Sequence, residues 1–143
     1  MDSGYITALA ALGGAALGGL TSFATSWTTL RTQMKAQRSA SSKSKRQKLY
    51  KAFIDDAAKI YGDALIHDKL EITGLIDLHA LVSRMRIVSS RPVIEVAVNV
   101  VKAITETYTQ PNKSSEEIEA MISNGSVDIL RSFSEACRDE LGI

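Results

Sequence analysis

The feature that most constrains this chain is an uncharged, largely apolar run of 28 residues from Ser3 to Leu30. A bilayer core about 30 Å thick is crossed by roughly 20 helical residues, so the run is long enough to span a membrane. Tyr5 and Trp27 lie about 33 Å apart along a helix, which suits the aromatic belts at the two membrane interfaces. The sequence therefore predicts a transmembrane helix over residues 3–30, anchored by Tyr5 and Trp27. The alternatives are a core helix of a soluble domain and a phase-separating tail.

The charges are divided between two parts of the chain. There is no acidic residue between Asp2 and Asp55, and eight of the 17 basic residues lie in residues 31–51. From Ala52 onward nine basic and 15 acidic residues leave a net charge of −6. A secretory signal begins with basic residues, whereas here the positive charge follows the apolar run. Because cytoplasmic flanks carry excess Lys and Arg, we expect an outside N-terminus, a basic juxtamembrane stalk (31–48) and a cytoplasmic helical domain (49–143).

The predicted span is weakly hydrophobic, because Gly, Ala, Ser and Thr dilute its five leucines. Small residues recur at every fourth position in two adjacent rows, one of Ala10, Gly14, Gly18, Ser22 and Ser26 and one of Thr7, Ala11, Ala15 and Gly19. Such rows allow helix backbones to approach closely in lipid. We therefore predict that the span packs against copies of itself or against a partner's span. The alternative is a span that merely tolerates small residues.

Five basic residues of the following segment fall within one helical stripe about 100° wide, namely Arg31, Lys35, Arg38, Lys45 and Arg46. Such a stripe suits anionic lipid headgroups, which attract each basic residue by about 1 kcal/mol. The alternative is that these charges only set the topology. No aromatic residue is interleaved before Tyr50 and no groove-reading motif follows, so nucleic-acid binding is not expected. Residues 39–42, Ser-Ala-Ser-Ser, have low helix propensity and predict a hinge or a weak point in one long helix.

Helical spacing is plain from Leu49 onward. A first helix to near His67 is expected to turn inward Leu49, Tyr50, Phe53, Ile54, Ala57, Ala58, Tyr61, Ala64 and Leu65. Asp68 and Glu71 have capping-box spacing, and they precede a second helix with Leu75, Ile76, Leu78, Leu81, Val82, Met85 and Val88. The break at residues 89–92 places Pro92 in the first turn of a third helix.

The third helix is expected to run to about Thr109. Its apolar positions, Val93, Ile94, Val96, Ala97, Val98, Val100, Val101 and Ile104, are mostly β-branched, so a buried strand is the minority alternative. Residues 114–117 form a capping box for a fourth helix, which residues 124–125, Asn-Gly, interrupt. Ser126 is a candidate cap for a last helix through Leu141. The fold class predicted is all-α, a compact bundle of four or five helices.

Few residues of the predicted domain suggest a chemical site. Arg84, Arg86 and Arg91 surround the start of the Pro92 helix and are a candidate anion site; otherwise they are solvated or ion-paired. His67 is four residues from both Asp63 and Glu71, but a histidine near a helix C-terminus is commoner than a metal ligand, and His79 would have to come from another helix. No metal or other cofactor is expected. Cys137 shares a helical face with Phe133 and Leu141, as a buried apolar residue does. No phosphate loop, nucleophile elbow, zinc spacing or catalytic carboxylate pair appears, so an enzyme is not expected.

Three parts of the sequence together carry a resemblance: the Gly-rich span, the basic stalk, and the segments LYKAFIDDAAKIYGDALIHD and LIDLHALVSRMRIVSSRPV. They resemble uncharacterised small single-span membrane proteins of the alphaproteobacterial type with a cytoplasmic helical domain. The resemblance covers most of the chain and implies a bacterial inner membrane location. It implies no activity, cofactor or site.

These observations lead to three hypotheses. The first is a non-enzymatic membrane-anchored protein that self-associates through its span and presents the acidic helical domain as a scaffold for a membrane or cytoplasmic protein partner. The second is a homo-oligomeric, holin-like pore lined by the hydroxyls of Thr7, Thr21, Ser22, Thr25, Ser26, Thr28 and Thr29. The third is a sensor domain that binds a metal or an anion at His67 or at Arg84–Arg91.

Overall fold

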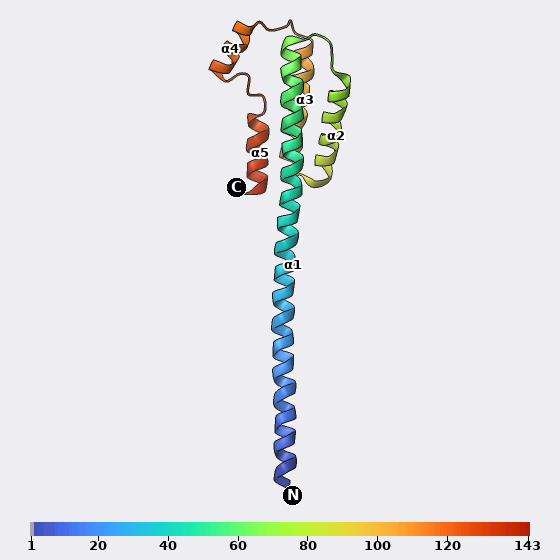
Figure 1. Cartoon of the computed structure of the whole chain (residues 1–143), viewed down its shortest axis with the longest axis vertical. Helices are drawn as coiled ribbons and strands as arrows, with labels where there is room; N and C mark the ends of the chain where they lie inside the picture. The colour runs from blue at the N-terminus through green and yellow to red at the C-terminus, as the bar shows by residue number, and fades with distance from the viewer. Residues whose placement is uncertain (1) are drawn as a thin grey trace. The chain divides into compact units, whose positions relative to one another are not determined.

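The computed structural model describes residues 2–143, with side chains from Ser3 onward. The all-α class is confirmed, and the described residues contain five helices and no strand. In chain order these are α1 (Asp2–Ile66), α2 (Ile72–Val88), α3 (Arg91–Tyr108), α4 (Ser115–Asn124) and α5 (Arg131–Leu141), as Figure 1 shows. The β-branched segment around Val100 is thus helical, because its apolar residues follow a period of 3.6.

The chain divides into two units, one ending at Ser42 and one running from Lys43 to Ile143. Helix α1 contributes residues to both units and stays helical through Ser39–Ser42, where the sequence predicts a hinge or a weak point. Among the described residues, α1 is also the one helix that is long and apolar enough to cross a membrane.

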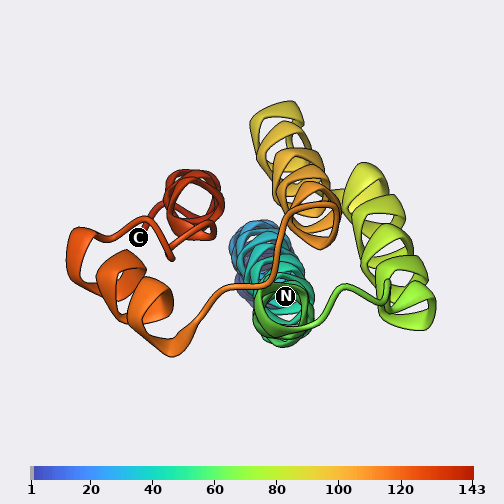
Figure 2. The same ribbon diagram turned by 90° about the horizontal axis from the view of Figure 1, so that it is seen from above.

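The hydrophobic core lies entirely in the second unit. Figure 2 shows α2 and α5 on opposite sides of the C-terminal part of α1, with α3 between them. The side chains with the least exposure come from all four of these helices, and they include Phe53, Leu78, Met85, Ile104 and Phe133. Phe133 of α5 packs its ring 4.7 Å from that of Phe53 of α1. Helix α4 has no buried residue and lies at the edge of the unit.

Most of the predicted inward positions are buried, but four are exposed. Ala58 is exposed, and Ile76, Val88 and Val98 keep 62%, 40% and 41% of their surface. Ala58, Ile76 and Val98 lie on the outer side of a helix whose opposite side already fills the core, and Val88 is the last residue of α2. Ile60 and Tyr108, which the periodicity did not single out, are buried instead.

Two predicted helix starts are confirmed and two are wrong. Pro92 lies in the first turn of α3, and Ser114 with Glu117 forms the capping box of α4. The predicted box at Asp68 is wrong, because Glu71 is itself the N-cap of α2 and accepts from the Gly74 N–H. Glu71 therefore lies at the boundary rather than in the first helical turn.

The predicted cap at Ser126 is also wrong, because α5 begins only at Arg131. Gly125 ends α4 with φ of 77°, and the next five residues form turns rather than a helix. Three of these turn residues are apolar and pack against the core, namely Val127, Ile129 and Leu130. The contacts of these partly buried side chains with the core stabilise the turns between α4 and α5.

Helices α1 and α2 pack closely at Gly74. A Cβ atom at this position would lie 2.8 Å from Cδ1 and 3.0 Å from Cγ1 of Ile60. A larger residue at position 74 thus requires the Ile60 side chain to move. Glycine is favoured here by the spacing between the two helices and not by its backbone conformation, since its φ is helical.

Candidate functional site

The first unit exposes the whole apolar run of α1. Every side chain from Ser3 to Ser42 is exposed, and Leu17 and Phe23 keep 70% and 68% of their surface. No other described part of the chain covers this surface, which is about 42 Å long over 28 residues at 1.5 Å each. Monomeric soluble proteins rarely expose contiguous apolar surface of this size, which marks a protein or membrane interaction site.

The two predicted rows of small residues lie along this exposed surface. A Cβ atom built on Gly14, Gly18 or Gly19 meets no other atom within 4 Å. The remaining members, Ala10, Ala11, Ala15 and Ser22, are exposed as well. No side chain of the described chain fills the rows, so they are open to a second helix.

The threonine hydroxyls of the run form hydrogen bonds within α1. Thr21 donates to the Leu17 carbonyl oxygen at 2.8 Å, and Thr25 donates to the Thr21 carbonyl oxygen at 2.9 Å. Thr7, Thr28 and Thr29 donate in the same way to the residue four positions earlier. A hydroxyl whose proton is bonded by its own helix needs no water. These threonines are therefore compatible with lipid and do not require an aqueous lumen.

The predicted interface anchors and the basic stripe differ in their contacts. Tyr5 is 76% exposed, whereas the Trp27 ring lies 6.2 Å from the Phe23 ring and 5.2 Å from the Arg31 guanidinium. Of the five stripe cations, Arg31, Lys35, Arg38 and Lys45 form no ion pair with any described residue. Arg46 belongs to the second unit and pairs with Glu140 at 3.9 Å.

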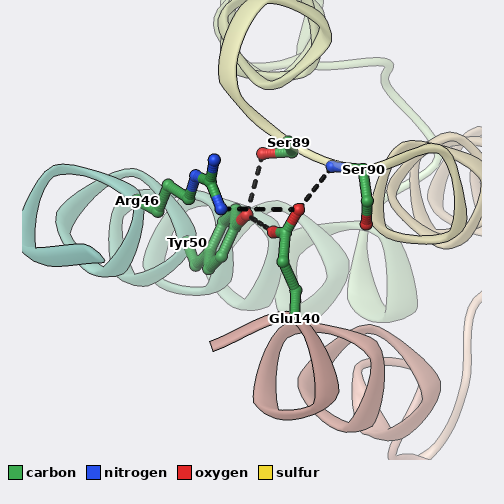
Figure 3. Close-up of polar contacts among 5 residues, drawn as sticks. All are labelled: Arg46, Tyr50, Ser89, Ser90 and Glu140. Atoms are coloured by element: carbon green, nitrogen blue, oxygen red, sulfur yellow. Dashed lines mark hydrogen bonds and ion pairs between the residues drawn. The ribbon is translucent and has the colours of Figure 1, made fainter. Parts of the chain in front are cut away.

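Glu140 of α5 joins three parts of the second unit, as Figure 3 shows. Its carboxylate accepts hydrogen bonds from the Tyr50 hydroxyl of α1 and from the Ser90 backbone N–H. The Ser89 and Tyr50 hydroxyls are 2.8 Å apart. We call this set, Arg46, Tyr50, Ser89, Ser90 and Glu140, the Glu140 junction.

The Glu140 junction takes the place of a local helix cap. Ser90 is the N-cap residue of α3, but its own side chain makes no capping hydrogen bond. The Glu140 carboxylate instead accepts from the Ser90 N–H and places a negative charge at the positive end of the helix dipole. A carboxylate distant in sequence thus accepts one backbone N–H at the start of α3 and links α5 to that helix.

Burial and the neighbouring groups shift the pKa of the Glu140 carboxyl group in opposite directions. Burial raises its pKa, but the hydrogen bonds from Tyr50 and Ser90 and the charge of Arg46 together hold the pKa below its usual range. Burial, followed by the hydrogen bond to Glu140, raises the pKa of Tyr50 to about 12. The junction therefore holds a carboxylate and a neutral phenol at neutral pH. This arrangement is structural, since it presents no activated nucleophile or base.

The three arginines of the candidate anion site do not converge at the start of α3. Arg84 and Arg86 are exposed on α2, and the Arg91 guanidinium pairs with Glu95 at 2.9 Å. The N-cap N–H of α3 already binds the chain's own anion, Glu140. Sequence reasoning missed Glu140, although its place three residues after Cys137 put an acid on the apolar side of α5.

The histidine cluster also has a structural explanation. The His67 Nδ1 atom lies 2.7 Å from Asp63 Oδ1, and the Tyr108 hydroxyl donates to Asp63 Oδ2 at 2.7 Å. The hydrogen bond from Tyr108 is the largest cause that lowers the pKa of Asp63. Glu71 belongs to the next helix boundary, and His79 is exposed on α2. Among the described side chains of residues 3–143, no three or more of the ligand residues His, Cys, Asp and Glu converge.

A shallow groove of about 540 Å³ lies between α1 and α5. Its lining is mainly apolar and includes Tyr50, Ile54, Cys137 and Leu141. Burial raises the pKa of the Cys137 thiol to about 12, with a further contribution from Glu140. Cys137 is thus a buried, protonated thiol on the same face as Phe133 and Leu141, as predicted.

Comparison with protein-family models, curated proteins and solved structures finds no match to this chain.

Proposed function

We propose that this chain is a non-enzymatic, single-span protein of a bacterial inner membrane. In this proposal it self-associates through the small rows of α1 and presents the acidic helical domain, residues 49–143, to a partner on the cytoplasmic side. The observation that carries the proposal is the uncharged run of Ser3–Leu30, which is exposed along its full length. In water this surface is unfavourable by about 25 cal/mol per Å² of apolar area, and a bilayer removes that cost.

Self-association is supported by the open rows of small residues. Between hydrocarbon tails and helices there is no hydrophobic driving force, so association depends on close packing of backbones. Gly14 and Gly18 lie one turn apart on the same side of α1, and nothing within the described chain occupies the space beside them. The α1 helix of a second copy can occupy this space, because it presents the same rows of small residues.

Leucine substitutions in the rows test the packing. Gly14→Leu and Gly18→Leu insert a bulky side chain where two backbones meet, so each is expected to reduce the full-length oligomer to a monomer in mild detergent. The measurement is the molar mass of the protein by light scattering with the detergent contribution subtracted.

Gly13→Leu is the matched control. Gly13 lies on the side of α1 away from the small rows and also has open space around it, so the same Gly-to-Leu change should leave the oligomer intact. If Gly14→Leu and Gly18→Leu keep the wild-type mass, the proposed packing is wrong. If all three variants lose it, the small rows are not the specific surface.

A homo-oligomeric pore is the alternative function. It has weaker support, because five of the seven hydroxyls that could line a lumen, those of the threonines, are bonded to the α1 backbone. Ion flux through vesicles containing the purified oligomer separates the two functions. A steady leak of small ions that Gly14→Leu abolishes would favour the pore over the scaffold.

A further inference from the structure

We propose that the segment where the apolar run meets the basic stalk is a binding site for an anionic phospholipid. The site is a shallow pocket of about 480 Å³ on one side of α1, lined by Trp27, Leu30, Arg31, Met34, Lys35 and Arg38. We call it the lipid pocket. The inference rests on the proposed membrane insertion and adds to it the chemical class of lipid that is bound.

The lipid pocket has an apolar side and a basic side. Leu30 and Met34 are four residues apart and keep 56% and 50% of their surface exposed. Arg31 and Lys35 are also four apart, and Arg38 follows three residues later, so the cations form a second row beside the apolar one. A phospholipid has the same division, with acyl chain and phosphate joined at one point.

The three cations of the pocket have no acidic partner among the described side chains. No ion pair involving them occurs among residues 3–143, and the sequence has no acidic residue between Asp2 and Asp55. Where acids are within reach, cations of the second unit pair with them, as Lys51 does with Asp55 and Lys102 with Glu106. No acid lies near the pocket in the sequence, and an anionic headgroup supplies the complementary charge.

Trp27 places the cations at the depth of lipid phosphates. Its ring lies 5.2 Å from the Arg31 guanidinium, within the range of a cation–π contact. With Trp27 at the interface, Arg31 follows about 6 Å and Lys35 about 12 Å further along the helix. Side chains on a helix lean toward its N-terminus, here toward the membrane. Lys35 can thus reach back to the headgroup layer, which is about 5–8 Å thick on each side. Arg38, about 17 Å along the helix from Trp27, lies within about one Debye length of that layer and adds to the attraction.

Positive charge alone is enough to set the orientation of a membrane span. The apolar row and the Trp27 ring beside the cations are not needed for that purpose, and they indicate a site for a lipid. Each basic residue near an anionic surface increases binding by about five-fold. The three pocket cations together are therefore expected to enrich an anionic lipid at Trp27 by roughly 100-fold relative to a variant without them.

Trp27 is the only tryptophan in the chain and reports directly on the lipid beside it. The test places full-length protein in phosphatidylcholine vesicles with a minor fraction of phosphatidylglycerol and measures quenching of Trp27 fluorescence by bromine. The bromine is carried on the acyl chains of one lipid or of the other. We expect brominated phosphatidylglycerol to quench more strongly than the same mole fraction of brominated phosphatidylcholine.

The decisive variant combines Arg31→Gln, Lys35→Gln and Arg38→Gln, and it should lose the preference. The control combines Lys43→Gln, Lys48→Gln and Lys51→Gln, which removes the same charge from exposed positions outside the pocket and outside the basic stripe and should keep the preference. Gln at these positions preserves helix propensity, so both variants keep α1 intact.

The outcomes separate this inference from the proposed function. Equal quenching by both brominated lipids overturns the lipid pocket while leaving membrane insertion in place. Equal loss of preference in the decisive and control variants also overturns it, because general charge attraction then explains the result. Absence of quenching by either lipid places Trp27 outside the bilayer and overturns both proposals.

Discussion

Replacing Glu140 with Gln is expected to destabilise the second unit by roughly 2 kcal/mol. The side chain of Glu140 is 9% exposed and accepts hydrogen bonds from Tyr50 and Ser90. Hydrogen bonds to a charged group contribute about 1.5–3 kcal/mol, against about 1 kcal/mol for neutral ones. Tyr50 and Ser90 donate to different carboxylate oxygens, whereas Gln has one acceptor oxygen. Gln therefore weakens the bond it keeps by about 1 kcal/mol, and the Tyr50 hydroxyl must turn to accept from the amide, at a further cost of about 1 kcal/mol. Gln also removes the negative charge at the N-terminus of α3.

The assay is thermal unfolding of the full-length protein in mild detergent, followed by circular dichroism. For a unit of this size 1 kcal/mol corresponds to roughly 4–8 °C, so the midpoint should fall by roughly 8–16 °C. Glu135→Gln is the matched control, since Glu135 lies on the same helix but is exposed. Equal midpoints for the two variants would refute the structural role of the Glu140 junction.

The same variant has a predicted pH signature. The folded pKa of Glu140 lies below its unfolded value, which is about 4.3. Its contribution is therefore fully present above that value and is lost as the pH falls through the folded pKa. The stability difference between wild type and Glu140→Gln should shrink as the solution is acidified below about pH 4. A difference that stays constant down to pH 2 would contradict this reasoning.

Two further substitutions probe the packing of the second unit in the same unfolding assay. Gly74→Leu should cost about 1–3 kcal/mol, because its Cβ would already lie 2.8 Å from Ile60 Cδ1, whereas Gly62→Leu enters open space and should be tolerated. Tyr108→Phe should lower the free energy of unfolding by about 1 kcal/mol, because it removes the hydrogen bond to Asp63, whose side chain is about one-third exposed. Tyr61→Phe is the control, because the Tyr61 hydroxyl forms no side-chain hydrogen bond within residues 3–143. A Gly74→Leu protein as stable as wild type, or a Tyr61→Phe protein less stable than Tyr108→Phe, would count against the packing described.

Local patterns predicted the helices and much of the core. Pro92, the capping box at Ser114 and the glycine at position 125 mark helix ends through their own backbone chemistry, which the sequence displays directly. The apolar spacing from Tyr50 to Leu65 likewise reports which side of α1 faces the core. The exposed Ile76 shows the limit of that reasoning, because periodicity does not reveal which apolar side a second helix will cover.

The Glu140 junction lies beyond local patterns for a different reason. Glu140 is separated by 90 residues from Tyr50 and by 50 from Ser90. No spacing rule connects residues so far apart, and the missing side-chain cap at Ser90 becomes visible only when α3 and α5 are placed together. Likewise, the sequence showed a basic stripe, but it did not separate Arg46, which pairs with Glu140, from the unpaired cations of the lipid pocket.

The position of Glu140 in the chain also bears on the order of events during synthesis. Glu140 is made after every other member of its junction, and it follows Leu30 by 110 residues. At about 5–20 residues per second, the ribosome needs roughly 5–20 s to cover that interval. The apolar run of α1 therefore emerges well before α5 can complete the second unit. In the proposed membrane assembly, copies translated together would have this interval in which to associate in the bilayer before their second units complete folding.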